Sequence, residues 1–212
     1  MNALTTVFLV DDDESYLKAT ARMLTAEGFR VGMFPSADRL RAAVSPDTRG
    51  CVVADLSMPE MDGLALQAAL SRTGIHMPLV FLSGQGDIPS TVRAMRGGAV
   101  DFLEKHVPRE QLVATIRRAL ERDVVDSARR SQFADIRRRF EALSKREHQV
   151  LREVLRGQMN KQIAAALGIS ERTVKLHRTA IKQKIGVQSA AQLASLARDA
   201  GLSAERATGV DA

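Results

Sequence analysis

The stretch Val7-Phe-Leu-Val-Asp-Asp-Asp13 joins four consecutive apolar residues to three consecutive aspartates. A short apolar run bounded by polar residues is typical of a buried strand, and the aspartates fall where that strand would end. The same arrangement recurs at Cys51-Val-Val-Ala-Asp55, where a second apolar run is followed at once by a carboxylate. The sequence therefore predicts acidic side chains at the carboxyl ends of two buried strands.

Three further apolar runs extend this pattern along the first half of the chain. We expect strands at residues 7–10, 31–34, 51–54, 79–82 and 100–103. The segments between them have an apolar period near that of a helix, which is about 3.6 residues. Strand–helix alternation of this kind favours an α/β fold, a doubly wound five-stranded parallel sheet of the flavodoxin-like type, with ligands bound at the carboxyl ends of its strands.

Polar side chains follow four of these strands, and in a parallel sheet they would converge on one edge. They are Asp11, Asp12, Asp13, Asp55, Ser83 and Lys105. Crowded carboxylates repel unless they hold a cation, and a site of oxygen ligands suits Mg²⁺. A carboxylate beside Mg²⁺ can attack a phosphoryl group, which would make Asp55 the nucleophile, Lys105 the stabilising cation and Ser83 a hydrogen-bond donor. The alternative is that the strand-end aspartates only cap helices.

Four stretches together resemble the receiver domains of two-component response regulators. They are Val10-Asp-Asp-Asp-Glu14, Asp55-Leu-Ser-Met-Pro-Glu-Met-Asp-Gly63, Leu82-Ser-Gly84 and Asp101-Phe-Leu-Glu-Lys105. The resemblance implies that Asp55 is the phosphoacceptor and that Asp12 contacts Mg²⁺ directly. It also implies that Asp11 acts largely through water and that the Ser57 carbonyl is a further Mg²⁺ ligand.

The same resemblance assigns a switch pair and one departure. The Ser83 hydroxyl would turn toward the phosphoryl group and let Phe102 rotate inward, while Gly84 would leave the pocket open. Receivers usually have proline directly after the pocket lysine, in a cis peptide bond, but here His106 follows Lys105. Because a cis bond before a non-proline residue costs about 2.5–4 kcal/mol, we expect a trans bond and a less well aimed Lys105.

The region after the predicted sheet lacks helix breakers. Between Pro108 and Gly157 there is neither proline nor glycine. We expect a helix at 109–122 and a helical linker at 123–141 that could continue it; a loose tether kept solvated by five arginines is the alternative. An apolar stripe along the linker could zip against a partner chain. Its residues are Phe133, Ile136, Phe140 and Leu143.

The C-terminal part is predicted to be all-α. We expect helices at 145–156, 160–167, 171–185 and 190–199. Ser144 with Glu147, and Ser189 with Gln192, have the spacing of capping boxes. Charge supports a separate role for this part: residues 1–125 hold 14 Lys and Arg against 16 Asp and Glu, whereas residues 137–200 hold 14 against 5. A basic module favours nucleic acid as its ligand.

The second and third of these helices have the pattern of a helix-turn-helix, with Gly168 at the turn. Val174, Ile181 and Ile185 would face the core of a four-helix domain. The opposite face would enter the major groove of DNA, and it carries Arg172, Lys175, Leu176, Thr179 and Lys182. Together with Leu143-Ser-Lys-Arg-Glu147, this region resembles the LuxR-type helix-turn-helix of NarL/FixJ-type regulators. The resemblance implies base contacts by Lys175, Leu176 and Thr179, and phosphate contacts by Arg172, Lys182 and Lys161.

These patterns predict a receiver domain at 1–122, a linker at 123–141, a LuxR-type domain at 142–200 and a frayed tail at 201–212. The protein would be a transcription factor that accepts a phosphoryl group from a sensor histidine kinase, and no enzyme beyond its own phosphorylation and dephosphorylation. We expect phosphorylation to promote a homodimer, and the resemblance implies two contact surfaces for it, at residues 88–103 and 190–199. Double-stranded DNA would be its ligand and RNA polymerase a further partner.

A lone cysteine, Cys51, and the lack of a secretion signal or membrane-spanning run suggest a cytoplasmic location. Two alternatives remain at this point. One is a DNA-binding regulator whose receiver works without phosphorylation. The other is a phosphatase similar to haloacid dehalogenases, because Asp11 and Asp13 have the spacing of that family's Asp-x-Asp motif and Asp11 would then carry the phosphoryl group.

Overall fold

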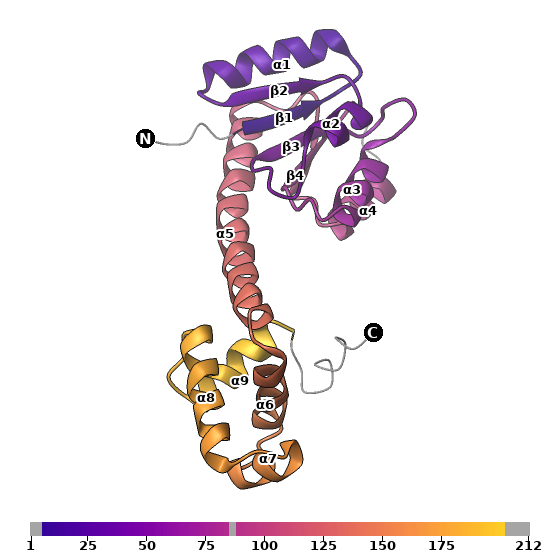
Figure 1. The fold of residues 1–212 in the computed structure, drawn as a ribbon. Helices are drawn as coiled ribbons and strands as arrows, with labels where there is room; N and C mark the ends of the chain where they lie inside the picture. The colour runs from indigo at the N-terminus through magenta and orange to yellow at the C-terminus, as the bar shows by residue number, and fades with distance from the viewer. Residues whose placement is uncertain (1–5, 85–87, 202–212) are drawn as a thin grey trace. The chain divides into compact units, whose positions relative to one another are not determined.

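The computed structural model describes residues 6–84 and 88–201, which fall into two compact units divided between Ser127 and Ala128 (Figure 1). Apart from Gly201, the tail expected at 201–212 lies outside the described residues. Within the described ranges, no helix combines the length and the apolar character needed to span a bilayer.

The first unit is built on a parallel sheet of five strands (Figure 1). The strands are β1 (Thr6–Val10), β2 (Arg30–Phe34), β3 (Cys51–Asp55), β4 (Leu79–Ser83) and β5 (Asp101–Glu104). Their order is β2-β1-β3-β4-β5. The doubly wound sheet predicted from the sequence is therefore confirmed. All residues of β3 and β4 are buried, because helices cover both faces of a parallel sheet and its central strands must be apolar throughout.

Two apolar layers hold helices against this sheet. Helices α1 (Glu14–Ala26) and α5 (Arg109–Glu141) pack on one face. Helices α2 (Ala37–Ala43), α3 (Gly63–Arg72) and α4 (Ile88–Arg96) pack on the other. Because all five strands run parallel, the carboxyl ends of β1, β3, β4 and β5 lie at the same edge of the sheet.

The second unit contains four shorter helices around one apolar core, as predicted. They are α6 (Lys145–Leu155), α7 (Asn160–Leu167), α8 (Glu171–Ile185) and α9 (Ala190–Asp199). Both capping boxes are present: the Ser144 and Ser189 side chains accept hydrogen bonds from the backbone N–H groups of Glu147 and Gln192. Gly168 ends α7 with a φ of 64°, which a glycine adopts without the strain that a side chain would cause.

Helix α5 runs for 33 residues through the segment predicted as a helical linker. Its last turns belong to the second unit, where Ile136 and Phe140 are buried together with Leu143 in the core of that unit. For these three residues the expectation that the stripe zips against a partner chain is therefore wrong, because they are already buried within their own domain. Phe133, the fourth residue of the stripe, is half-buried and its ring lies 5.5 Å from the Arg129 guanidinium. The sequence pattern alone did not distinguish a partner's surface from the chain's own core.

Candidate functional site

The parallel register brings the predicted acidic pocket together. Val10 pairs with Ala54, Asp55 pairs with Leu82, and Ser83 pairs with Glu104, so the strands end at nearly the same level. The backbone N–H of Lys105 donates to the carbonyl of Ser83 over 2.8 Å. The residues that follow β1, β3, β4 and β5 therefore meet at one edge of the sheet.

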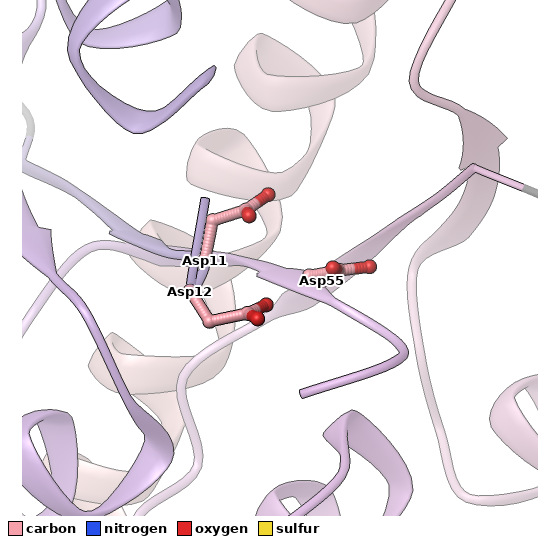
Figure 2. Close-up of side chains that lie close together, drawn as sticks. All are labelled: Asp11, Asp12 and Asp55. Carbon is pink, nitrogen blue, oxygen red and sulfur yellow. The ribbon is translucent and has the colours of Figure 1, made fainter. Parts of the chain in front are cut away.

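Three carboxylates form the floor of this pocket. Figure 2 shows Asp11 and Asp12 side by side at the end of β1, with Asp55 at the end of the neighbouring strand β3; one oxygen from each lies within 4.8 Å of the others. Asp11 and Asp55 are buried, whereas Asp12 is exposed. The Lys105 ammonium lies 2.7 Å from Asp11 Oδ2 and 2.9 Å from Asp55 Oδ2. One ammonium does not balance three carboxylates, so the donor set fits a further hard divalent cation with oxygen ligands.

The ionisation of the pair at the centre follows from its surroundings. Burial raises the pKa of Asp11, although the hydrogen bond from Lys105 works in the opposite direction. Burial by itself would lower the pKa of Lys105, but its hydrogen bonds to Asp11 and Asp55 outweigh that effect and raise the pKa. Lys105 therefore stays an ammonium, whose charge is in place beside Asp55.

Asp13 has a different role from its two neighbours. Its Oδ1 accepts hydrogen bonds from the backbone N–H groups of Ser15 and Tyr16, so it caps the amino end of α1. The capping interpretation of the strand-end aspartates therefore holds for Asp13. Asp62 caps α3 in the same way through the N–H of Ala65.

The remaining residues predicted for the pocket lie around the cluster of Asp11, Asp12, Asp55 and Lys105. Ser83 is buried at the end of β4, and Phe102 is half-buried with its ring centroid 6.3 Å from that of Phe81. Among the described residues, a Cβ built on Gly84 would meet no atom within 4 Å, which agrees with an open pocket. Ser57 is exposed, and its backbone N–H donates to Asp55 Oδ1 over 3.3 Å.

The loop after Lys105 has the expected trans peptide bond, but Lys105 is not displaced from the pocket as we expected. The peptide bonds of the described segments are all trans, including the Lys105–His106 bond, and His106 is exposed. Lys105 nevertheless reaches both buried carboxylates, so the prediction that it is poorly aimed is wrong for this state.

Tyr16 contributes to the position of the Lys105 side chain in the pocket. This role was not predicted from the sequence. The Lys105 ammonium lies 4.7 Å from the centroid of the Tyr16 ring, where the π-face attracts a cation. The Tyr16 hydroxyl also donates to the Lys105 carbonyl over 3.3 Å. The only signal for this role in the sequence is the position of Tyr16 in the first turn of the helix that follows the aspartates.

Gly63 is a second residue whose role only the structure reveals. A Cβ at this position would lie 2.6 Å from the Asp55 carbonyl oxygen and 2.7 Å from a ring carbon of Phe81. The first residue of α3 therefore packs directly behind Asp55. A glycine is needed there because the start of α3 approaches the Asp55 carbonyl and the Phe81 ring too closely for a side chain.

The second candidate site is the exposed face of α8. Val174, Ile181 and Ile185 are buried in the core, as predicted. The residues expected to contact bases or phosphates turn outward: Lys161, Arg172, Lys175, Leu176 and Thr179 are exposed, and Lys182 is partly so. The cationic face therefore points away from the domain core, as entry into a DNA groove requires.

A groove beside α8 brings three of these residues together and leaves the others outside it. Its lining includes Lys175, Thr179 and Lys182. Arg178 also lines the groove and donates to Asn160 Oδ1 on α7 over 2.9 Å. Arg178 was not predicted from the sequence, because it lies between the apolar and the exposed faces of α8.

An acidic pocket on a five-stranded parallel sheet, followed by a helix-turn-helix domain, defines a response regulator. Comparison with known families agrees: residues 7–117 match the response regulator receiver domain, and residues 141–197 match the luxR family of bacterial regulatory proteins. The chain belongs to the response regulators of the NarL/FixJ type, which are transcriptional regulators with a LuxR-type DNA-binding domain. This assignment replaces the phosphatase alternative.

Individual relatives cover nearly the whole chain. Nodulation protein W of Bradyrhizobium diazoefficiens is 40% identical and covers 93% of this chain and 87% of that protein. The transcriptional regulatory protein FixJ of Rhizobium meliloti is 42% identical over 92% of this chain and 96% of its own length. Among solved structures, the response regulator StyR is 41% identical with a TM-score of 0.78, over 92% of this chain and 99% of that one.

Proposed function

We propose that Asp55 accepts a phosphoryl group from a phosphohistidine of a sensor kinase, and that this modification controls DNA binding by α8. The observation that carries the proposal is the Lys105 ammonium bridging Asp11 and Asp55 beside a third carboxylate, Asp12. In the transfer, a carboxylate oxygen of Asp55 bonds to phosphorus while the phosphorus–nitrogen bond breaks, and the leaving imidazole takes up a proton.

The residues of the pocket divide the work of this step. Lys105 is already within hydrogen-bond distance of Asp55 and neutralises charge that develops on the phosphoryl oxygens. Ser83 supplies a hydroxyl donor at the end of β4. Asp11, Asp12, Asp55 and the Ser57 carbonyl would hold Mg²⁺. When bound, Mg²⁺ supplies electrostatic stabilisation of the transferring group.

The coupling to DNA binding rests on the second switch residue. Phe102 is half-buried against the core around Phe81, so part of its ring is not held by packing in this position. Turning of the Ser83 hydroxyl toward the phosphoryl group would let Phe102 move inward. That movement would change the surface formed by α4 and β5.

We infer that this surface mediates dimerisation. Three large apolar side chains are exposed on α4: Ile88 at 81%, Val92 at 41% and Met95 at 45%. They share one helical face within the predicted region 88–103, and α9 at 190–199 would add a second contact. A dimer would place two α8 helices on two half-sites of double-stranded DNA in the cytoplasm, where RNA polymerase could be contacted.

Phosphorylation is tested by treating the protein with radiolabelled acetyl phosphate, with and without Mg²⁺. We expect labelling that requires Mg²⁺ and disappears in the Asp55→Asn variant. Asp62→Asn is the matched control, because Asp62 caps α3 and asparagine caps equally well. Undiminished labelling of Asp55→Asn would refute the assignment.

The regulatory half of the proposal needs a separate measurement. DNA affinity and sedimentation are compared before and after acetyl phosphate treatment. A tighter, dimeric complex in the wild type but not in Asp55→Asn supports phosphorylation control. Equal affinity and equal oligomeric state in both conditions would favour the alternative, a receiver that works without phosphorylation.

A further inference from the structure

The carboxyl end of α8 is held by a residue outside the helix-turn-helix. Arg139, in the last turns of α5, donates from Nη1 to the carbonyl oxygen of Ile185 over 3.0 Å. Ile185 is the last residue of α8, and carbonyls at a helix end have no partner in their own helix. A guanidinium there supplies a charge-assisted hydrogen bond and also faces the negative end of the helix dipole.

The residue that follows α8 leaves room for this contact. Gly186 has a φ of 81°, which ends the helix in the left-handed region. A Cβ built on Gly186 would lie 3.0 Å from Arg139 Nη1, closer than a side chain is normally tolerated. Glycine therefore both turns the chain and makes space for the guanidinium.

The backbone that carries Arg139 is itself fixed in the second unit. Ile136 and Phe140, on either side of it in α5, are 9% and 1% exposed in the core around α6 and α8. A second charged contact acts at the same end of α8, where the Lys184 ammonium lies 2.8 Å from Glu147 Oε2 at the start of α6. Directional contacts from α5 and α6 therefore hold the last turn of α8.

Directional contacts matter here because the hydrophobic effect that favours apolar burial is itself non-directional. Val174, Ile181 and Ile185 bury one side of α8 and so fix which face points to the core. A hydrogen bond to the helix end adds a constraint with a defined length and direction. A helix advances about 1.5 Å and turns about 100° per residue, while a binding group works only within roughly 0.5 Å and 10–20° of its productive position. A small error in α8 would misplace Lys175 and Thr179 against base edges.

We propose that Arg139 is a positioning residue for base recognition: it does not touch DNA but fixes the register of α8 through the Ile185 carbonyl. The proposal rests on the proposed function, in which α8 reads the major groove. It also implies that the DNA-reading unit begins within α5, before residue 141 where the match to the luxR family starts.

The test uses the full chain and two DNA probes, a duplex enriched by the wild-type protein from a randomised pool and an unselected random duplex. For Arg139→Gln we expect about a tenfold loss of affinity for the selected duplex, which corresponds to the discrimination of one base contact. Affinity for the random duplex should change by less than about twofold, with an unchanged salt slope, because phosphate contacts are kept. Amide exchange at Gly186 and Val187 should become faster.

Two further variants separate position from charge. Arg139→Lys keeps a cation near the helix end and should recover most of the preference for the selected duplex. Arg137→Gln removes the same charge from the same turn of α5, but Arg137 pairs with Glu141 in its own helix and should leave both affinities unchanged.

Each other outcome contradicts the proposal in an identifiable way. Equal losses on both duplexes, with a salt slope smaller by about one, would make Arg139 a phosphate contact. A lower melting temperature with an unchanged affinity ratio would reduce Arg139 to a structural role. If wild-type protein enriches no sequence from the pool, the proposed reading of bases by α8 fails first, and the role of Arg139 fails with it.

Discussion

The carboxylate of Asp123 accepts a hydrogen bond from the backbone N–H of Gly50, with Oδ2 and N separated by 3.1 Å. Asp123 lies on α5, beyond the matched receiver region that ends at residue 117, yet it is only 5% exposed. Gly50 directly precedes β3, the strand that ends in Asp55, and a Cβ there would lie 2.3 Å from the Thr6 carbonyl oxygen. This contact therefore ties α5 to the start of the central strand.

Replacing Asp123 should destabilise the receiver unit. In Asp123→Ala the buried N–H of Gly50 loses its acceptor, which costs about 1–3 kcal/mol. Asp123→Asn keeps an acceptor oxygen and should cost less. Urea unfolding measures both, with Asp126→Ala as the control, since Asp126 pairs with Arg122 at the surface over 3.5 Å. Equal midpoints for Asp123→Ala and Asp126→Ala would contradict the prediction.

Gly63→Ala should disturb both stability and phosphorylation. Its Cβ would collide with the Asp55 carbonyl and the Phe81 ring, and such overpacking costs about 1–3 kcal/mol. Because the displaced backbone carries Asp55, labelling by acetyl phosphate should slow as well. Gly84→Ala places its Cβ in open space and should leave stability within about 0.5 kcal/mol of wild type. Wild-type stability of the Gly63→Ala protein would contradict the prediction, because the backbone around Asp55 would then accommodate the added Cβ.

Tyr16 should influence phosphorylation through Lys105. Tyr16→Leu removes the aromatic face under the ammonium, so we expect slower labelling of Asp55 with little change in overall fold. Tyr16→Phe keeps that face and loses only the 3.3 Å hydrogen bond to the Lys105 carbonyl, so labelling should stay near the wild-type rate. Identical rates for the leucine and phenylalanine variants would exclude the cation–π contact as a cause.

Glu147 should make the DNA-binding unit sensitive to acid. Burial disfavours its charge, but hydrogen bonds from Lys184 and from Ser144 outweigh burial and lower the pKa of Glu147 to about 2 from a usual 4.5. Because the folded-state pKa of Glu147 is lowered, the contribution of Glu147 to folding stability is fully present above the unfolded-state pKa. That contribution is lost as pH falls through about 4.5 toward 2.

The contribution of Glu147 is on the order of 2 kcal/mol, since Lys184 is half-exposed and solvent screens the pair. Urea midpoints of the second unit measured from about pH 6 to about pH 3 should fall in wild type and change less in Glu147→Gln. Glu141→Gln is the control, because Glu141 pairs with Arg137 at the exposed surface. The same acid profile in Glu147→Gln and wild type would contradict the assignment.

Residues on α8 should separate sequence preference from general affinity. Lys175→Ala and Thr179→Ala should each cost about 1–3 kcal/mol on a selected duplex and much less on random DNA. Lys182→Ala should weaken both duplexes alike and lower the salt slope by about one. Binding isotherms at several salt concentrations measure both effects. If Lys175→Ala weakens selected and random DNA equally, its role as a base contact is wrong.

Several parts of this protein follow from local sequence. Apolar runs placed all five strands, because strands buried on both faces require consecutive apolar residues. Periodicity, Ser144, Ser189 and Gly168 placed the C-terminal helices, because caps and turns depend on short-range chemistry. The sequence even identified Asp11, Asp55 and Lys105 as neighbours, because all parallel strands end at one edge.

Only the tertiary structure decided which partner each side chain has. The triplet at 11–13 divides into two pocket carboxylates and one helix cap, the stripe ending at Phe140 packs into its own domain, and Arg139 reaches the end of α8. A helical or strand period fixes which face a residue lies on. It does not fix what packs against that face, because contacts between residues far apart in the chain are set by how whole elements pack together.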